Sequence, residues 1–177
     1  MERCTSTTKV FDGRILKLRV DKVVFDDGLQ ATREVVEHRG ASVIIPLLED
    51  NRVLLVRQYR YAIGKELLEI PAGTCNEGEP PEICAQRELQ EETGYACNDL
   101  EKVLECYVAP GYSTEKIYFY LARKLRKTEL APDDDERITV EPFSIAEVLS
   151  KIRNGEISDA KTICAFFRIL DFVSLTP

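Results

Sequence analysis

The chain has 177 residues, of which 44% are hydrophobic and 31% charged, and its formal net charge is -7. This size and composition fit one globular domain with an ample core and at most a small additional region. The acidic balance disfavours nucleic acid as a partner, since phosphate backbones attract basic faces, whereas an anionic small molecule could still bind through bridging cations.

The sequence gives no sign of export or of a membrane anchor. The first residues, MERCTSTTKVFDG, lack the apolar segment of a signal peptide, and no apolar run approaches the ~20 residues of a membrane span. The six cysteines have no CxxC spacing and there is a single histidine, so a zinc site is not expected. We expect a cytoplasmic protein with reduced thiols and no membrane contact.

Strands dominate the first seventy residues. Alternating apolar and polar residues predict strands over 14–25 and 31–38, joined by a turn. Segments 41–48 and 53–60, rich in Val, Ile and Leu, predict a buried hairpin. Residues 67–73 predict a short strand ending in a turn.

The second half mixes strands and helices. Ser144 and Glu147 form a predicted capping box, and Gly155 a helix stop. After a helix from about Pro80, we expect strands over 100–110, 116–125 and 137–143, an acidic loop over 130–136, and helices over 144–155 and 159–173.

This order of elements indicates the fold class. Helices follow hairpins instead of alternating with each strand, which predicts an α/β (α+β) fold with a mixed sheet sandwiched by helices, rather than a doubly wound parallel sheet. The first strands are expected to form a small antiparallel sheet of their own. The predicted division is an N-terminal β-strand region over 1–39 and a main domain over 40–177.

Residues 73–95, GTCNEGEPPEICAQRELQEETGY, crowd carboxylates onto a predicted helix. Pro80 and Pro81 suit the first helical turn, where an N–H would be unpaired anyway. Gly94 suits a left-handed exit from the helix. The helix is therefore predicted from about Pro80 to Thr93.

The acidic side chains of this helix need a counter-charge. At about 100° per residue, Ala85 and Leu89 share a stripe that can pack on the sheet, and Glu88 and Glu92 lie beside it with Glu91 on the flank. Like charges one turn apart repel each other. Solvation, a salt-bridge partner or a metal ion would each reduce that repulsion, and oxygen ligands suit Mg²⁺ or Mn²⁺.

The complete spacing resembles the Nudix box of the Nudix hydrolase family. Gly73 is followed after five residues by Glu79, and after seven more by Arg87-Glu88-Leu89-Gln90-Glu91-Glu92-Thr93-Gly94-Tyr95, with tyrosine in the final apolar place. The resemblance implies a loop–helix–loop that binds divalent metal and a nucleoside diphosphate linked to another moiety.

The same resemblance implies roles for individual residues. Glu88 and Glu92 are expected to bind metal, with Glu91 as a further ligand or a proton acceptor and the Ala72 carbonyl as another ligand. Four residues are expected to hold the motif together structurally, namely Gly73, Glu79, Arg87 and Gly94.

Three features outside the box resemble the ADP-ribose pyrophosphatase branch. VRQYR (56–60) precedes LEIPAG (68–73), Pro110 lies fifteen residues beyond Tyr95, and 133–162 resembles an acidic loop, a helix and a GEIxDAKT stretch. The resemblance extends from about residue 12 to 170.

The branch suggests substrate contacts. Arg60 is the first candidate for binding a phosphate and Arg57 a second, although Arg57 could equally be a surface cation on its strand. Glu34 corresponds to a glutamate that contacts adenine, and Arg33 is a further candidate.

The acidic loop offers a proton acceptor. By composition it reads as a solvated turn, but the resemblance assigns Glu136 as a mobile catalytic base, with Asp134 or Asp135 in its place if the register shifts. Glu91 is the alternative base.

The expected reaction is Mg²⁺-dependent hydrolysis of ADP-ribose to AMP and ribose 5-phosphate. Alternatives are another nucleoside diphosphate sugar such as GDP-mannose, or an inactive module that binds ADP-ribose. The resemblance to the ADP-ribose pyrophosphatase branch also implies that the N-terminal strands form a homodimer, in which the partner contributes to the adenine pocket.

Overall fold

The computed structural model describes residues 1–128 and 137–172. They form two compact units, Met1–Ala41 with Glu105–Ile117, and Ser42–Leu104 with Tyr118–Pro177. The mixed α+β architecture expected from the sequence is confirmed.

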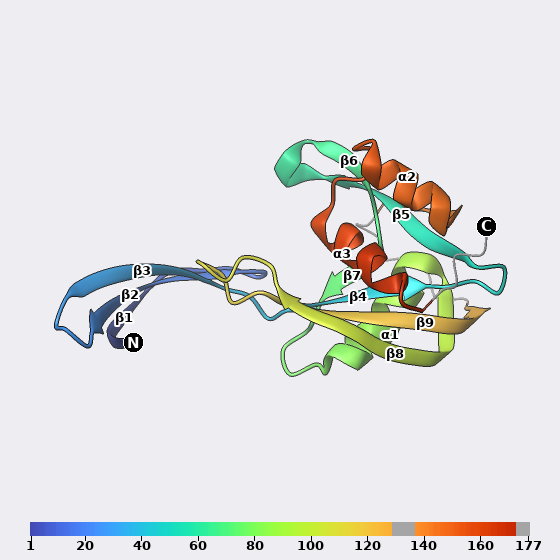
Figure 1. Ribbon diagram of the computed structural model, residues 1–177. Helices are drawn as coiled ribbons and strands as arrows, with labels where there is room; N and C mark the ends of the chain where they lie inside the picture. Colours follow the sequence, from blue (N-terminus) through green and yellow to red (C-terminus); the bar gives the residue numbers. More distant parts are fainter. Residues whose placement is uncertain (129–136, 173–177) are drawn as a thin grey trace. The chain divides into compact units, whose positions relative to one another are not determined.

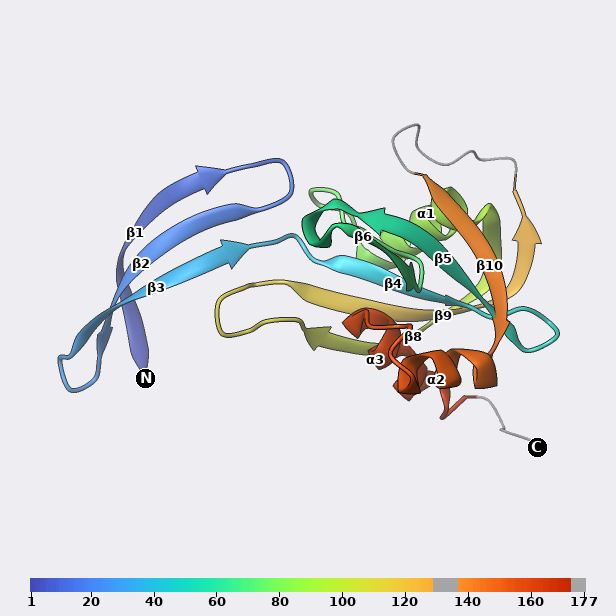
Figure 2. The ribbon, with the colours of Figure 1, turned by 90° about the horizontal axis from the view of Figure 1, so that it is seen from above.

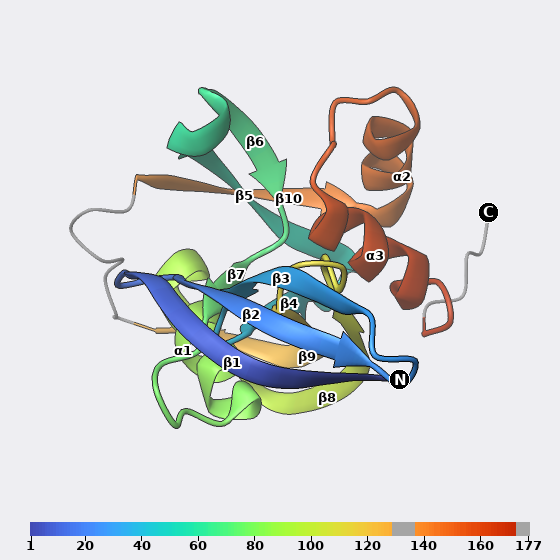
Figure 3. The same ribbon diagram turned by 90° about the vertical axis from the view of Figure 1, so that its left-hand side faces the viewer.

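The first unit is built on an antiparallel sheet of three strands in the order β1-β2-β3 (Figure 3). These are β1 (Glu2–Asp12), β2 (Lys17–Phe25) and β3 (Gln30–Glu37). The sequence analysis missed β1, because all eleven of its residues are exposed and so have no apolar–polar alternation. Antiparallel pairing with β2 holds this segment in an extended conformation.

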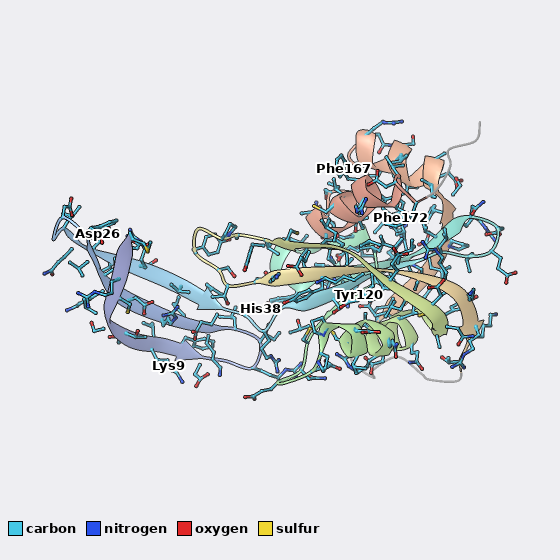
Figure 4. All side chains as sticks on the ribbon, turned by 60° about the horizontal axis from the view of Figure 1, so that its bottom comes forward. Lys9, Asp26, His38, Tyr120, Phe167 and Phe172 are labelled. Atoms are coloured by element: carbon cyan, nitrogen blue, oxygen red, sulfur yellow. The ribbon has the colours of Figure 1, made fainter. Side chains whose placement is uncertain are left out.

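Residues 105–117 complete the first unit beside β3. The Val36 N–H donates to the Tyr112 carbonyl at 2.8 Å, and the Thr114 N–H donates to the Val36 carbonyl at 2.9 Å. His38 lies at the end of β3 (Figure 4), where its Nδ1 accepts a hydrogen bond from the Gly40 N–H at 3.0 Å. This unit therefore combines two stretches that are far apart in the sequence.

The second unit contains two further sheets, with strand orders β10-β5-β6 and β7-β4-β9-β8 (Figure 2). Their strands are β4 (Ala41–Pro46), β5 (Arg52–Arg60), β6 (Lys65–Glu69), β7 (Ala72–Thr74), β8 (Tyr95–Tyr107), β9 (Lys116–Lys127) and β10 (Ile138–Ser144). The helices are the short η1 (Tyr61–Ile63), α1 (Pro81–Thr93), α2 (Ile145–Arg153) and α3 (Ala160–Ile169).

Two strand predictions need correction. The predicted hairpin of 41–48 and 53–60 is wrong: a single bridge joins Leu47 and Val53, while β4 and β5 belong to different sheets. The predicted strand over 67–73 is two strands, β6 and β7, also in different sheets. Continuous apolar runs do not reveal which neighbour a buried strand pairs with, so the sequence pattern could not separate these cases.

Helices α1 and α3 lie on opposite faces of the four-stranded sheet (Figure 1). On the α1 side, Ala85 and Leu89 are fully buried in a cluster with Ile44, Tyr120 and Ala122, which confirms the predicted packing stripe. Figure 4 shows Tyr120 beside α1. On α3, Ala165, Phe166 and Ile169 are fully buried.

The predicted ends of α1 and the predicted capping box of α2 are confirmed, whereas the last helix, predicted over 159–173, ends at Ile169. Pro80 and Pro81 start α1, and Gly94 ends it in the left-handed region at φ 73°. Ser144 and Glu147 form both hydrogen bonds of a capping box on α2. Within residues 1–128 and 137–172, no helix is long and apolar enough to cross a membrane.

The packing of α1 leads to a stability prediction. Leu89→Ala should lower the free energy of unfolding by about 2–5 kcal/mol, because it removes a fully buried side chain and leaves a cavity. The matched control is Ile83→Ala on the same helix, where the side chain is 52% exposed and the expected change is within about 0.5 kcal/mol. Urea unfolding measures both, and equal losses would contradict the assigned packing.

Candidate active site

A tight loop leads from β7 into α1. The Glu79 N–H donates to the Asn76 carbonyl at 3.0 Å, and the Asn76 N–H donates to Glu79 Oε2 at 2.7 Å. Gly78, at φ 75°, supplies the left-handed backbone that the turn requires. Glu79 is thereby fixed just before the first turn of the helix.

Arg87 is the centre of the carboxylate cluster. Its Nε and Nη2 donate to the two oxygens of Glu79, both at 3.0 Å. Its Nη1 donates to Glu88 Oε1 at 2.6 Å and to Glu91 Oε2 at 2.8 Å, and its Nη2 also reaches the Thr74 carbonyl at 3.3 Å. One guanidinium therefore joins the loop to two carboxylates of the helix.

These contacts shift the protonation equilibria of the pair that joins loop and helix. The hydrogen bonds from Arg87 hold the pKa of Glu79 below its usual range, and the Glu79 carboxylate in turn raises the pKa of Arg87. Both groups are consequently charged at neutral pH, which keeps the loop attached to the helix.

Gly73 lies directly against the Glu88 side chain. A Cβ atom at position 73 would be 1.9 Å from both Cδ and Oε1 of Glu88, a separation that atoms cannot adopt. The Glu88 side chain is only 11% exposed, so it has little room to move away. A residue without a side chain is therefore required here.

Glu92, one turn further along α1, holds the residue before Gly73. The Ala72 N–H donates to Glu92 Oε2 at 2.9 Å, and Glu92 is 4% exposed. Three predicted metal-binding residues, Ala72, Glu88 and Glu92, thus lie where α1 meets β7. Glu91 joins them through Arg87 and is the most exposed of the carboxylates, with 26% of its side chain accessible.

The donor atoms of the cluster are of the kind that a hard divalent cation binds. All the atoms on offer are oxygens, and the Oε1 of Glu88 and Oε2 of Glu91 share one nitrogen of Arg87, so they are close to one point. Oxygen ligands of this kind suit Mg²⁺ and Mn²⁺. Among residues 1–128 and 137–172, no group of three or more His, Cys, Asp or Glu side chains is arranged to hold a metal ion, and the guanidinium occupies the space between two of the carboxylates.

Arg60 belongs to a second charged cluster. Its Nε and Nη2 donate to the two oxygens of Glu69 at 2.8 and 2.7 Å. Lys161 also hydrogen-bonds Glu69, whose side chain is 1% exposed. Burial raises the pKa of Glu69, but Arg60 and Lys161 outweigh this and hold that pKa below its usual range.

The other predicted substrate-binding residues lie elsewhere. Arg57 pairs with Glu141 on β10, with Nε 2.7 Å from Oε1, and it takes no part in the Arg60 cluster. Arg33 and Glu34 lie on β3 in the first unit, where Arg33 donates to Glu2 at 2.7 Å and Glu34 is exposed.

Glu136, with its alternatives Asp134 and Asp135, lies outside the described residues. The sequence analysis also missed Glu69 and Lys161, which are 92 residues apart. Glu69 lies in LEIPAG and Lys161 in DAKT, two stretches that the sequence analysis used only for the family resemblance. An ion pair between residues so far apart produces no periodic pattern in the sequence.

Comparisons with known proteins agree with the resemblance of residues 73–95 to the Nudix box. The NUDIX domain model matches residues 37–166, and the nucleoside diphosphate sugar hydrolase N-terminal domain model matches residues 2–36. The solved structure titled "Crystal structure of ADP compounds hydrolase" has the same fold, with a TM-score of 0.85 and 23% sequence identity. The match covers 97% of this chain and 93% of that one.

Three relatives illustrate the range of names. A methanol dehydrogenase activator of Bacillus methanolicus is 39% identical, covering 93% of this chain and 90% of its own. An ADP-ribose pyrophosphatase of Bacillus subtilis (strain 168) is 34% identical with the same coverage. A GDP-mannose pyrophosphatase of Cronobacter sakazakii is 38% identical over 73% of this chain and 76% of its own. The chain therefore belongs to the Nudix family and carries the N-terminal domain of its nucleoside diphosphate sugar hydrolases.

Proposed function

We propose that this enzyme hydrolyses ADP-ribose to AMP and ribose 5-phosphate with Mg²⁺, or alternatively Mn²⁺, as its cofactor. The proposal is supported by the intact box glutamates and by the cationic Arg60 at the end of β5. It is also supported by the Bacillus subtilis relative named ADP-ribose pyrophosphatase, whose similarity covers 93% of this chain.

The grouping of four carboxylates at the start of α1 and along it carries this proposal. Four carboxylates, Glu79, Glu88, Glu91 and Glu92, are joined to one guanidinium, Arg87, or to the adjacent Ala72 N–H. Three of these carboxylates share the single guanidinium, and like charges this close together repel one another. A divalent cation bound to these oxygens would reduce that repulsion, which favours metal binding over an isolated fold-stabilising role.

The proposed ligands are Glu88, Glu91, Glu92 and the Ala72 carbonyl. When bound, divalent metal neutralises charge on the diphosphate and lowers the pKa of the attacking water. Arg60 donates to a phosphate oxygen and adds positive charge there. Glu136, or Glu91 in its place, accepts the proton from the water. Gly73, Glu79, Arg87 and Gly94 keep loop and helix in register.

The substrate distinguishes this proposal from its alternatives. A GDP-mannose pyrophosphatase is supported by the Cronobacter relative, although that similarity covers less of this chain. An inactive module that binds ADP-ribose is disfavoured because Glu88, Glu91 and Glu92 are all present. Arg33 and Glu34 are proposed adenine contacts, and Arg57 is a weaker phosphate contact because Glu141 already pairs with it.

The purified protein should be tested with ADP-ribose, ADP-glucose, GDP-mannose, NADH and diadenosine polyphosphates, with the products identified. We expect AMP and ribose 5-phosphate from ADP-ribose at the highest kcat/KM, loss of turnover in EDTA, and recovery when Mg²⁺ is added back. Preferred hydrolysis of GDP-mannose would replace the proposed substrate, and full activity in EDTA would contradict the metal-dependent chemistry.

A separate prediction concerns Glu92. Glu92→Gln keeps an oxygen that can accept the Ala72 N–H but removes a charge, so it should lower kcat by about 100-fold or more while the melting temperature changes little. Glu82→Gln, at an exposed position on the same helix, is the matched control and should leave kcat unchanged. A large fall in melting temperature with full activity would show that Glu92 serves packing alone.

The N-terminal sheet is proposed to form a homodimer. All of β1 is exposed, including Val10 at 57% and Phe11 at 54%, and exposed apolar residues favour association. Light scattering should give about twice the chain mass of 20.1 kDa. Val10→Glu should shift the distribution toward monomer, because it places a charge on this surface. A wild-type monomer at micromolar concentration would contradict the proposal.

A further inference from the structure

Four charged residues form a chain between β5 and α3 in the second unit. Arg60 donates two hydrogen bonds to Glu69, Lys161 binds the same carboxylate, and Lys161 also lies 3.0 Å from Asp159 Oδ1. Positive and negative groups alternate along the chain. At its centre the Glu69 side chain is 1% exposed, so its charge depends on these partners.

The chain fixes the orientation of the Arg60 guanidinium. Both hydrogen bonds to Glu69 use the Nε and Nη2 edge, which is the paired geometry that a planar fork and a carboxylate favour. The Nη1 edge therefore points away from Glu69. The Arg60 side chain is 37% exposed, so a ligand can reach it, and the negative charge of Glu92 is near enough to act on Arg60.

Lys161 itself is engaged on both sides. Its ammonium lies between Glu69 and Asp159, and its side chain is 20% exposed. Asp159 is in turn held as the N-cap of α3, accepting from the Thr162 N–H at 2.9 Å and from the Thr162 hydroxyl at 2.6 Å. The lysine is thus a fixed bridge between α3 and the Glu69 carboxylate rather than a mobile surface cation.

A neighbouring hydrogen bond connects α3 to the backbone beyond Glu69. The Ile70 N–H donates to the Thr162 hydroxyl at 2.9 Å, and both groups are fully buried. The first turn of α3 therefore holds residue 69 by its side chain and residue 70 by its backbone. This arrangement leaves Glu69 little freedom to follow Arg60 if Arg60 moves, so Glu69 can serve as a stationary anchor.

We propose that Lys161 is a positioning residue which, through the shared Glu69 carboxylate, holds the Arg60 guanidinium in the orientation that binds a phosphate of the substrate. The inference rests on the proposed function, since it assigns a support to the phosphate-binding arginine of that site. Lys161 touches no substrate in this scheme. Without it, the Glu69 carboxylate would lose its side-chain contact with α3, so Glu69 and the guanidinium bonded to it would no longer be held in that orientation.

The test is a double-mutant cycle of Lys161→Met and Arg60→Met, with steady-state kinetics on ADP-ribose at saturating Mg²⁺. Lys161→Met should raise KM about 5- to 20-fold with kcat within about threefold, because a ground-state phosphate contact is weakened. In the Arg60→Met background the same change should raise KM less than about twofold, because the lysine acts through the arginine. Lys161→Arg, which keeps the charge, should restore KM to within about threefold of wild type.

A matched control separates positioning from general stabilisation. Lys151→Met breaks the ion pair between Lys151 on α2 and Glu156 beyond the end of that helix, where Nζ is 2.6 Å from Oε2, and it should leave KM unchanged. Thermal unfolding accompanies every variant, and Lys161→Gln takes the place of Lys161→Met should the latter not fold. Melting temperatures that fall while KM stays constant would mean that Lys161 only stabilises the fold.

The outcomes distinguish this inference from the proposed function. If wild type hydrolyses ADP-ribose but the two substitutions raise KM independently, or Lys161→Met has no effect, the positioning role is overturned while the activity stands. If the wild-type enzyme prefers another nucleoside diphosphate sugar, the proposed substrate fails. The same cycle on that preferred sugar then tests the positioning role, and independent effects there overturn it.

Discussion

The site depends on one guanidinium that joins three carboxylates. Arg87 contacts Glu79 before the helix and Glu88 and Glu91 within it, so the loop and the helix are aligned by a single side chain. A planar fork with five donors can bind several carboxylates at once, which a lysine ammonium does less well. The same contacts that build the motif also bring together the carboxylates that we propose as ligands of a divalent cation.

The backbone of residues 71–73, which contacts α1, is also held by several interactions. Glu92 binds the Ala72 N–H, Glu88 lies against Gly73, and the Pro71 carbonyl accepts from the Ile44 N–H on β4 at 2.9 Å. Two of these contacts come from α1 and the third from β4, all within the second unit. A carbonyl at position 72 is thus held by the core of the unit rather than by a mobile loop, which favours a ligand of constant geometry.

Much of the helix could be predicted because its ends and its spacing are marked by particular residues. Pro80, Pro81 and Gly94 set its limits, and Ala85 and Leu89 set its buried face. Pairings between distant residues were less predictable. Strand β1 carries no alternation, β4 and β5 look like partners in sequence but join different sheets, and Lys161 meets Glu69 across 92 residues. Helix capping and hydrophobic periodicity are local patterns, so they do not predict contacts between residues that are distant in the sequence.

The short connection between β6 and β7 limits how the sequence of this enzyme can evolve. Glu69 and Ala72 are only three residues apart, yet one anchors the arginine and the other faces the acidic helix. Only residues 70 and 71 separate β6 from β7, so an insertion or deletion of one residue here would displace either Glu69 from Arg60 or Ala72 from Glu92. We therefore expect related chains to differ in the lengths of the surrounding turns, whereas the number of residues from Glu69 to Gly73 should stay the same.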